Sequence, residues 1–287
     1  MPELPEVETV RRGLEPVLRG AVLTHVLARR PDLRFPLPDD FKGRLEGATI
    51  ERLERRAKYL LARLDTGETL VMHLGMTGRF DIEADGAVSA PGAFAHPAPE
   101  GAKHAHVVFD TDGGARITYS DARRLGFMGL VPTAHLADHP WFKGMGPEPL
   151  GPDFNVEYLA DALEGRSQAI KTLLLDQRIV AGLGNIYVCE ALHRAHISPL
   201  KAGGKVTRAK LATLVETIRV VLEEAIEAGG STLRDFAATD GALGYFQHRF
   251  RAYGREDEPC LTPTCRGVIR RKVQGGRSTF YCPVCQK

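Results

Sequence analysis

Four of the five cysteines of this 287-residue chain lie in its last 28 residues, and their spacing limits how that tail can fold. Cys260 and Cys265 form one close pair, Cys282 and Cys285 form another, and sixteen residues separate the two pairs. This spacing is typical of a tetrahedral zinc site in which two hairpin turns each supply two thiolates. A disulfide or a redox pair fits less well, because we expect a reducing cytoplasm and find no thioredoxin-like surroundings. We therefore predict one structural Zn²⁺ with no open position for a substrate.

Basic residues gather in the same tail. From Ala242 to Lys287 there are nine Lys or Arg and three Asp or Glu, a net charge of +6, whereas the whole chain carries +2. Such a local excess suits contact with phosphates, although clusters of charge more commonly form a solvated face. Between the two cysteine pairs, Gly275-Gly276-Arg277 is expected to form the tip of the finger, with Arg277 facing outward.

The opposite end of the chain, Met1-Pro2-Glu3-Leu4-Pro5-Glu6, is compatible with catalysis or with a simple helix start. Removal of Met1 would leave Pro2 with a free secondary amine, and an α-amino group has a pKa of roughly 7.7 to 8.0. Such an amine can attack an aldehyde-like carbon and form a cationic iminium, with Glu3 beside it as general acid or base. Alternatively, the prolines only shape the first helical turn, and the N-terminus alone favours that interpretation.

Hydrophobic spacing predicts a helix and then a region of strands in the first half of the chain. Apolar residues recur at helical spacing from Pro5 to about Leu18. The charged residues of this helix are expected to face outward: Glu6, Glu8, Arg11 and Arg12. Short β-branched and apolar runs follow and predict an antiparallel sandwich or barrel. The runs are 21–27, 49–55, 59–64, 69–73, 106–110 and 115–120. The stretch 85–101, rich in Gly, Ala, Pro and Ser, is expected to be a mobile loop.

The second half is predicted to be helical. The Pro- and Gly-rich segment 144–152 is interpreted as a linker. Helices are expected at 156–163, at 168–175, from near Asn185, and after Thr207, the last with an apolar stripe that packs in the core. The glycine-dense turn before Asn185 suits a phosphate at a helix start, although glycine also simply permits tight turns. Cys189 is expected to be a buried small apolar residue.

The composition, 43% hydrophobic and 26% charged, is that of a globular protein. No apolar run approaches the length of a membrane span, and no charged-then-apolar leader precedes the first helix. We therefore expect a cytoplasmic protein that does not bind membranes.

Six motifs, in order along the chain, resemble the bacterial formamidopyrimidine-DNA glycosylase family. They are Pro2-Glu3-Leu4-Pro5-Glu6-Val7-Glu8-Thr9, Arg55-Arg56-Ala57-Lys58-Tyr59, His73-Leu74-Gly75-Met76-Thr77-Gly78, Asp121-Ala122-Arg123-Arg124, Gly182-Leu183-Gly184-Asn185-Ile186-Tyr187 and Gly276-Arg277-Ser278-Thr279-Phe280-Tyr281-Cys282. The resemblance implies an α+β multidomain fold with DNA in the cleft between domains. Its parts would be an N-terminal helix and β-sandwich (2–132), a linker (133–152), a helix–two-turns–helix domain (153–240) and a Cys₄ zinc finger (241–287).

The resemblance also implies catalytic roles for particular residues. Pro2 would be the nucleophile at C1′ of the damaged nucleotide, and Glu3 the proton donor that helps to open the sugar ring. Lys58, on a strand, would stabilise or protonate oxygen during β-elimination, and Arg277 would assist the second, δ-elimination. Considered without the family, Lys58 would be a surface lysine and Arg277 a phosphate clamp.

Further residues match DNA-contacting positions of the family: His104, Arg123, Arg166, Asn185 and, more loosely, Lys171. A glycosylase takes its base out of the helical stack, and the hole left behind must be filled. The resemblance assigns this to Met76, Arg123 and an apolar wedge at Leu125, where many relatives have Phe. Leucine is an accepted wedge, but stacking on the duplex should weaken.

The implied function is that of a monomeric base-excision repair enzyme acting on double-stranded DNA. It would remove oxidised purines such as 8-oxoguanine and formamidopyrimidines, then nick the abasic strand by β,δ-elimination. The sister endonuclease VIII type, which prefers oxidised pyrimidines, typically has Gly where this chain has Leu4. A non-catalytic zinc-finger DNA-binding protein would not need the four catalytic residues together. An N-terminal-proline tautomerase would explain Pro2 but not the zinc tip or the paired arginines.

Overall fold

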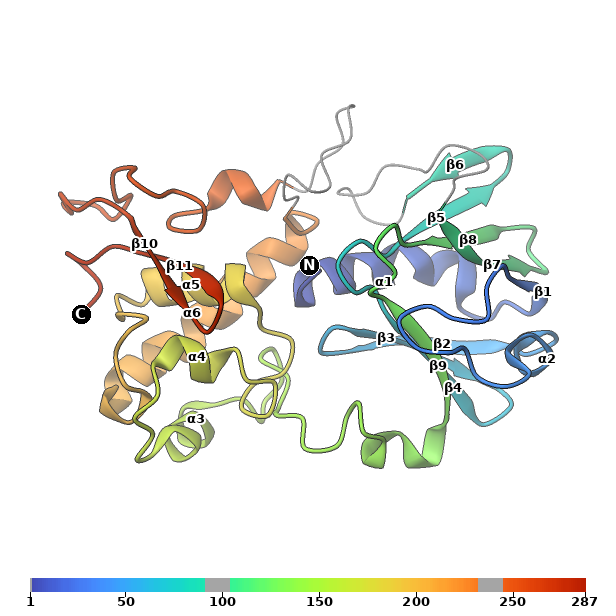
Figure 1. The fold of residues 1–287 in the computed structure, drawn as a ribbon, viewed down its shortest axis with the longest axis horizontal. Helices are drawn as coiled ribbons and strands as arrows, with labels where there is room; N and C mark the ends of the chain where they lie inside the picture. The colour runs from blue at the N-terminus through green and yellow to red at the C-terminus, as the bar shows by residue number, and fades with distance from the viewer. Residues whose placement is uncertain (1, 91–103, 232–244) are drawn as a thin grey trace. The chain divides into compact units, whose positions relative to one another are not determined.

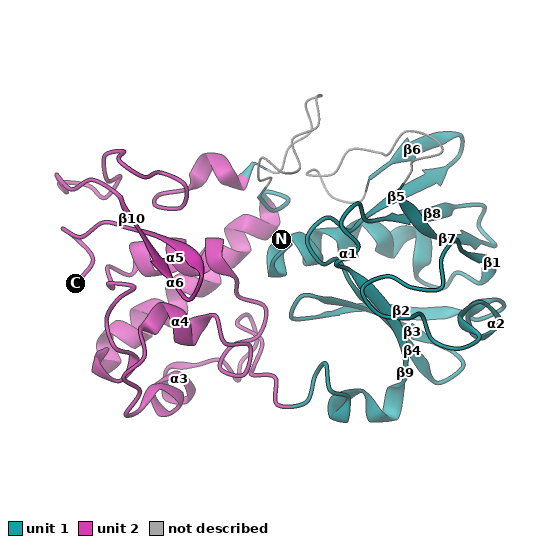
Figure 2. Ribbon diagram, in the orientation of Figure 1, with its two compact units in different colours: residues 1–143, 228–245 teal, residues 144–227, 246–287 magenta. Residues whose placement is uncertain are grey.

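The computed structural model describes residues 2–90, 104–231 and 245–287 (Figure 1). These residues divide into two compact units (Figure 2). Unit 1 lies within residues 1–143 and 228–245, and unit 2 within residues 144–227 and 246–287. The chain therefore leaves unit 1, builds the helical part of unit 2, returns to unit 1 for a short segment and ends in unit 2.

Unit 1 consists of helix α1 (Leu4–Leu18) followed by two antiparallel sheets. One sheet has the order β1-β7-β8-β5-β6, and the other has the order β2-β3-β4-β9. The strands are β1 (Leu23–Ala28), β2 (Ile50–Arg56), β3 (Tyr59–Leu64), β4 (Glu68–His73), β5 (Arg79–Ala84), β6 (Ala87–Ser89), β7 (Ala105–Thr111), β8 (Arg116–Ser120) and β9 (Phe127–Pro132). The short helices α2 (Phe41–Leu45) and η1 (Thr133–Asp138, a 3₁₀ helix) lie in its connections.

A single apolar core joins the two sheets and α1. Val26 and Phe109 from the first sheet belong to the same buried cluster as Leu53 and Leu60 from the second. Helix α1 contributes its apolar stripe, of which Leu14 is fully buried. Two antiparallel sheets that share one core form a β-sandwich, so the sandwich interpretation is the correct one.

Helix α1 forms as predicted, but not all of its charged residues face solvent. Glu6 is only 4% exposed, and the side chain of Glu8 is 12% exposed. The expectation that both face outward is therefore wrong. Helical periodicity assigns charged side chains to the solvent face, whereas here other segments of unit 1 supply hydrogen-bond partners for the two carboxylates.

The six predicted strands are present with ends that differ by at most two residues, but β5, β6 and β9 were not predicted. β6 lies inside 85–101 and pairs with β5 from Ile82 opposite Ser89 to Ala84 opposite Ala87. The loop expectation is therefore wrong for 87–89, because pairing with a neighbouring strand outweighs weak local propensity. Residues 91–101 of that stretch lie outside the described residues.

Unit 2 contains the predicted helices. They are α3 (Val156–Leu163), α4 (Ile170–Leu174), α5 (Asn185–Arg194) and α6 (Arg208–Glu227), with 3₁₀ helices η2 (Gly203–Lys205) and η4 (Phe246–Arg249). Thr207 Oγ1 accepts a hydrogen bond from the Lys210 N–H at 3.4 Å, as expected for a helix cap. The apolar stripe of α6 and Cys189 of α5 are buried as predicted.

The segment 144–152 is packed onto unit 2 rather than extended as free chain. The Gly146 N–H donates to the Gln177 carbonyl at 2.8 Å. Arg219 of α6 donates to the carbonyls of Gly151 at 3.1 Å and Phe154 at 2.6 Å. These bonds give the Pro- and Gly-rich backbone the partners that it cannot find in regular structure.

Unit 2 ends in an antiparallel hairpin of β10 (Arg270–Gln274) and β11 (Arg277–Tyr281). Across the described ranges of the chain, every helix is too short or too polar to span a lipid bilayer.

Candidate functional site

Helix α1 begins at Leu4, two residues after Pro2, the predicted nucleophile. Glu3 is the residue at the N-cap, and the Glu6 carboxylate accepts a hydrogen bond from the Glu3 N–H at 2.9 Å as part of a capping box. Pro2 and Glu3 are both buried. The capping box fixes the backbone of Glu3 and therefore the place of the residue immediately before it.

The second oxygen of Glu6 binds the segment that returns to unit 1 after α6. Glu6 Oε1 accepts hydrogen bonds from the Ser231 N–H at 2.8 Å and the Ser231 hydroxyl at 2.9 Å. Gly230 has a φ of +86°, and a Cβ there would lie 3.1 Å from the Glu6 side chain. The carboxylate thus joins the start of α1 to a segment 225 residues away in the sequence.

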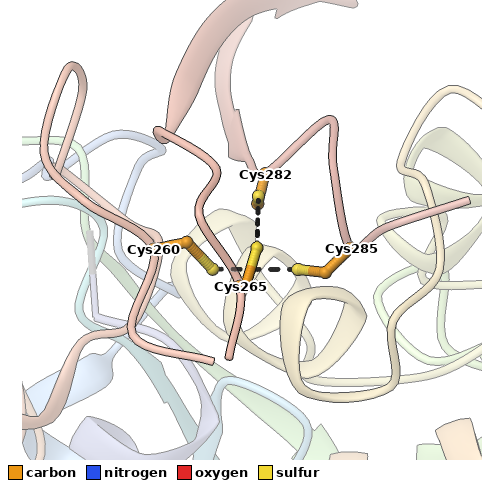
Figure 3. A group of neighbouring side chains, drawn as sticks. All are labelled: Cys260, Cys265, Cys282 and Cys285. Carbon is orange, nitrogen blue, oxygen red and sulfur yellow. Dashed lines mark hydrogen bonds between the residues drawn. The ribbon is translucent and has the colours of Figure 1, made fainter. Parts of the chain in front are cut away.

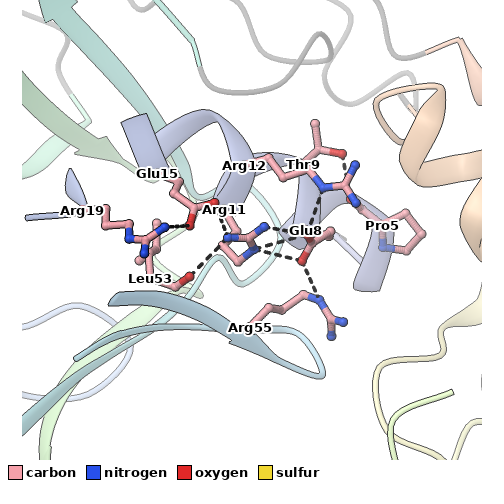
Figure 4. A network of polar contacts seen from close by, with 9 residues as sticks. All are labelled: Pro5, Glu8, Thr9, Arg11, Arg12, Glu15, Arg19, Leu53 and Arg55. Atoms are coloured by element: carbon pink, nitrogen blue, oxygen red, sulfur yellow. Dashed lines mark hydrogen bonds and ion pairs between the residues drawn. The ribbon is translucent and has the colours of Figure 1, made fainter. Parts of the chain in front are cut away.

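Glu8 connects α1 to strand β2 (Figure 4). Its carboxylate accepts hydrogen bonds from Arg11 at 3.0 Å, from Arg12 at 3.0 Å and from Arg55 at 3.2 Å. Burial by itself would raise the pKa of Glu8, but the hydrogen bond and charge of Arg11, the hydrogen bond of Arg12 and the charge of Arg55 hold it below its ordinary value. Glu8 is therefore ionised at neutral pH and orients the Arg55 guanidinium.

Arg55 in turn holds the hairpin tip that carries Lys58. Its Nη1 donates to the Ala57 carbonyl at 3.0 Å, and Ala57 has a left-handed φ of 52° in the turn between β2 and β3. Lys58 follows at once and is 8% exposed. It lies in the turn rather than on a strand, so the expectation that a strand carries it is wrong. The chain of contacts from Glu8 through Arg55 to Ala57 thereby positions Lys58 relative to the helix that begins behind Pro2.

His73 is a neutral neighbour of Lys58. Burial is the main cause that lowers the pKa of His73 to about 4, and the charges of Lys58 and Arg34 add to it. The ring stacks on Phe127 with centroids 5.1 Å apart, and its Nδ1 accepts the Gly75 N–H at 3.0 Å. The neutral ring therefore carries its proton on Nε2.

The fully buried carboxylate of Asp121 organises the turn that carries Arg123 and Leu125. One oxygen accepts hydrogen bonds from the Thr77 hydroxyl and, at 3.2 Å, from the Arg123 N–H. The other accepts the Gly126 N–H at 2.8 Å. Because Thr77 belongs to the loop that carries Met76, one side chain fixes both loops.

The residues predicted to fill the gap left by the flipped base lie in these two loops, Met76 in one and Arg123 and Leu125 in the other. The Arg123 guanidinium is 3.6 Å from Met76 Sδ. Arg123 is exposed, whereas Met76 and Leu125 are half-buried. His104 is exposed, and its carbonyl accepts the Asp121 N–H at 3.0 Å. The structure therefore brings these four predicted DNA contacts of unit 1 to one place.

Asp121→Asn is expected to lower the free energy of unfolding of unit 1 by about 1–3 kcal/mol, because the new amide turns an acceptor into a donor facing buried donors. Trp141 is the sole tryptophan of the sequence, and its residue number places it in unit 1. Its fluorescence in a urea titration measures the change. Asp39→Asn, at an exposed site, is the matched control. Equal stability of the two variants would show that the Asp121 contacts do not hold the turn.

Arg277 lies in unit 2, at the tip of the β10–β11 hairpin. Gly275 and Gly276 have positive φ values of 54° and 72°, as a two-residue type I′ turn requires, and Arg277 pairs with Gln274 across it. Arg277 is exposed, as predicted. The two glycines thus allow the sharp turn that presents its side chain to solvent.

Lys171 and Asn185 hold the strand behind Arg277. The Lys171 ammonium donates to the Ser278 carbonyl at 3.1 Å and to the Thr279 hydroxyl at 2.6 Å. The Asn185 side-chain amide donates to the same Ser278 carbonyl at 2.9 Å. Lys171 is fully buried, so the structure gives it a place inside unit 2 rather than on a DNA-facing surface.

The cysteine cluster forms a metal site at the base of the same hairpin (Figure 3). The Sγ atoms of Cys260, Cys265, Cys282 and Cys285 all lie within 4.8 Å of one another. The distances Cys260–Cys285 and Cys265–Cys282 are both 3.7 Å. Tetrahedral zinc with Zn–S bonds of about 2.3 Å places its sulfurs about 3.8 Å apart. The four residues therefore fit one structural Zn²⁺.

The predicted residues divide between the two units. Unit 1 carries Pro2, Glu3, Lys58, Met76, His104, Arg123 and Leu125. Unit 2 carries Arg166, Lys171, Asn185, Arg277 and the four zinc cysteines. Arg166 is exposed and follows the end of α3 in the sequence.

Sequence reasoning missed the residues that position these groups: Glu6, Glu8, Thr77 and Asp121. Glu6 and Glu8 carried usable signals: Glu6 stands at the N3 position of a capping box, and Glu8 precedes two arginines. Glu8 lies three and four residues before Arg11 and Arg12 on one helix face, a spacing at which ion pairs form. Glu6 and Asp121 each combine a partner close in the sequence with a distant one, Ser231 for Glu6 and Thr77 for Asp121.

A capped helix with a sandwich, a helical domain and a Cys₄ finger define a multidomain zinc-finger protein of the helix–two-turns–helix class. Family models match three consecutive segments. They are the formamidopyrimidine-DNA glycosylase N-terminal domain (1–128), the formamidopyrimidine-DNA glycosylase H2TH domain (145–237) and the zinc finger found in FPG and IleRS (257–287). The chain belongs to the formamidopyrimidine-DNA glycosylase family.

Curated relatives named formamidopyrimidine-DNA glycosylase match along their whole length. Those of Caulobacter sp. and Phenylobacterium zucineum are 65% and 64% identical, and each alignment covers 100% of both chains. Solved structures of the Lactococcus lactis protein are similar as well. A mutant bound to Fapy-dG containing DNA has a TM-score of 0.85 and 33% identity, and a complex with abasic site containing DNA has 0.84 and 34%, each covering 100% of both chains.

Proposed function

We propose that this protein is a bifunctional DNA glycosylase and abasic-site lyase of base-excision repair. It excises oxidised purines, notably 8-oxoguanine and formamidopyrimidines, from double-stranded DNA and then nicks the strand. The observation that carries this proposal is the Pro2–Glu3 pair, held at the start of α1 by the Glu6 capping box in a chain of this family. The enzyme acts as a monomer in the cytoplasm, where it binds the nucleoid.

In the first step the Pro2 nitrogen attacks C1′ of the damaged nucleotide, and the bond from C1′ to the base breaks. Glu3 donates a proton to the sugar ring oxygen, so that the ring opens and the C1′–N bond becomes an iminium. The cation makes the C2′–H acidic. Loss of the C2′ proton breaks the C3′–O bond and expels the 3′ phosphate, which is β-elimination. Loss of the C4′ proton then breaks the C5′–O bond and expels the 5′ phosphate, which is δ-elimination.

Lys58 and Arg277 assist these two eliminations. The hydrogen bond from Arg55 to the Ala57 carbonyl fixes the backbone next to Lys58. Arg277 stands exposed on a hairpin that Lys171 and Asn185 hold from within unit 2. Lys171 and Asn185 therefore hold the strand that carries Arg277. His104, Arg123 and Arg166 contact DNA.

Borohydride trapping on a duplex with 8-oxoguanine opposite cytosine tests this proposal, because reduction of the iminium leaves a stable cross-link. Mass mapping of the cross-linked peptide should place the adduct on Pro2. An adduct on a lysine would support the enzymatic activity but contradict the assignment of Pro2 as the nucleophile. A protein that lacks Met1 and gives no adduct would be a DNA-binding protein rather than a glycosylase. Faster excision of thymine glycol than of 8-oxoguanine would instead indicate the endonuclease VIII type.

Leu125→Phe is expected to tighten binding to a duplex with a tetrahydrofuran abasic analogue. An aromatic ring stacks on exposed bases better than a leucine, and a gain of about 1 kcal/mol corresponds to roughly fivefold in Kd. Leu125 is half-buried, so the larger side chain has solvent-facing room. Fluorescence anisotropy gives the affinity, with Leu125→Ala as the variant expected to bind more weakly. Equal or weaker binding by the Phe variant would contradict the wedge role.

A further inference from the structure

A histidine from outside the finger contacts one of the zinc cysteines. His193 lies on α5 and is 1% exposed. Its Nε2 is 3.3 Å from Cys260 Sγ. Its other ring nitrogen, Nδ1, is buried and has no hydrogen-bond partner among the described residues. The ring thus has a single polar contact in the part of the chain that the structure describes, and that contact is the sulfur.

The direction of this hydrogen bond follows from the chemistry of the metal site. A cysteine that binds zinc is a thiolate and can only accept a hydrogen bond. The proton of the imidazole therefore resides on Nε2, which donates to Cys260 Sγ. Nδ1 is then a bare acceptor, and no second N–H is buried without a partner.

Backbone groups of the finger supply further hydrogen bonds to the sulfurs. The Thr262 N–H lies 3.5 Å from Cys260 Sγ, and the Gly267 N–H lies 3.3 Å from Cys265 Sγ. Both donors belong to the chain segments that carry the ligands. The His193 contact differs, because it comes from a helix 67 residues earlier in the sequence.

Helix α5 also holds the chain that leads into the finger. Glu190, three residues before His193, accepts the backbone N–H groups of Arg251 at 2.8 Å, Ala252 at 2.9 Å and Tyr253 at 2.8 Å. Residues three apart lie on the same face of a helix. One face of α5 therefore holds the finger backbone through Glu190 and reaches a zinc ligand through His193.

We propose that His193 is a positioning residue of the zinc site, which donates a hydrogen bond to the Cys260 thiolate and slows the loss of the metal. Four thiolates and one Zn²⁺ leave a net charge of −2, and an N–H donor disperses part of it. The bond also holds Cys260 in place while zinc is bound. Partners of this kind are typically worth about 10–100-fold in metal affinity.

The test compares two amides at this position in the zinc-loaded full-length protein. In His193→Gln the amide nitrogen lies near the place of Nε2, whereas in His193→Asn it is too short to reach the sulfur. Zinc transfer to a chromogenic chelator is followed over time. We expect Asn to release zinc about 10–100-fold faster than the unchanged protein and Gln to restore most of the difference. Val188→Ala, a buried apolar change in the same helix, should release zinc at the unchanged rate.

A spectroscopic measurement separates the hydrogen bond from a loss of packing. With Co²⁺ in place of Zn²⁺, the sulfur-to-cobalt charge-transfer band should shift to lower energy in His193→Asn and not in Val188→Ala. Loss of the N–H donor raises the energy of the sulfur lone pairs, which causes the shift. Equal release rates and equal bands for the Gln and Asn variants would overturn the proposal. Because neither readout uses DNA, the result is independent of the proposed glycosylase activity.

Discussion

Replacing Glu3 with Gln is expected to lower the rate of base excision by about 10²–10⁴-fold, the usual contribution of a general acid. A glutamine cannot supply the proton that opens the sugar ring as the base leaves. It does retain a side-chain acceptor and the backbone N–H that Glu6 accepts at 2.9 Å, so the start of α1 should be unchanged. The variant therefore separates chemistry from folding.

The measurement is single-turnover excision from a duplex with 8-oxoguanine, together with affinity for an abasic analogue. Excision should fall while affinity stays unchanged, because binding does not require the proton. Glu15→Gln, a half-buried carboxylate on the same helix, is the matched control and should excise at the unchanged rate. If Glu3→Gln excised at the rate of the unchanged protein, the proton donor would have to be sought elsewhere.

Removal of zinc is expected to weaken binding to lesion DNA by about 100-fold or more while unit 1 stays folded. The finger has a very small core, formed by Ala252, Cys260, Ile269 and Cys282 with a few partly buried neighbours. A two-stranded hairpin is marginal by itself, and a structural Zn²⁺ supplies about 10–16 kcal/mol in finger peptides. Without it the basic tail can no longer present its phosphate-binding groups in a fixed arrangement.

The fluorescence of the single tryptophan reports on the folding of unit 1. Trp141 packs against Phe127 of β9 in unit 1, with ring centroids 4.7 Å apart. Its fluorescence in urea should give the same unfolding curve with and without zinc, while DNA affinity falls and recovers when zinc is returned. Cys189→Ala, which removes the thiol outside the cluster, should show the same zinc dependence. Metal-free protein that bound lesion DNA with unchanged affinity would rule out a role of the finger in binding.

The elements that the sequence predicted well are those whose evidence is local. The cysteine spacing specifies the metal site, because ligands supplied by two tight turns need no other part of the chain. Helix α1 and the buried stripe of α6 follow from apolar residues at helical spacing. Strand β6 could not be predicted in this way, because its pairing with β5 is not encoded in its own three residues.

The catalytic candidates came from motifs, but their supports came from the tertiary structure. Glu8 reaches Arg55 across 47 residues, Asn185 reaches Ser278 across 93, and Lys171 reaches Ser278 across 107. Considered with its own segment alone, each of these polar groups would be placed toward solvent or DNA. Burial makes a partner necessary, and only the folded chain shows which residue provides it.

The sequence by itself therefore determined the metal, the succession of sandwich, helices and finger, and the residues that resemble catalytic ones. The tertiary structure decided which distant groups support these residues. Glu6 accepts hydrogen bonds from Ser231, Asp121 joins two loops, and His193 contacts Cys260. The physical reason is the range of the interactions. Periodicity and ligand spacing act between near neighbours in the chain, whereas a buried hydrogen bond depends on which distant segments the core brings together.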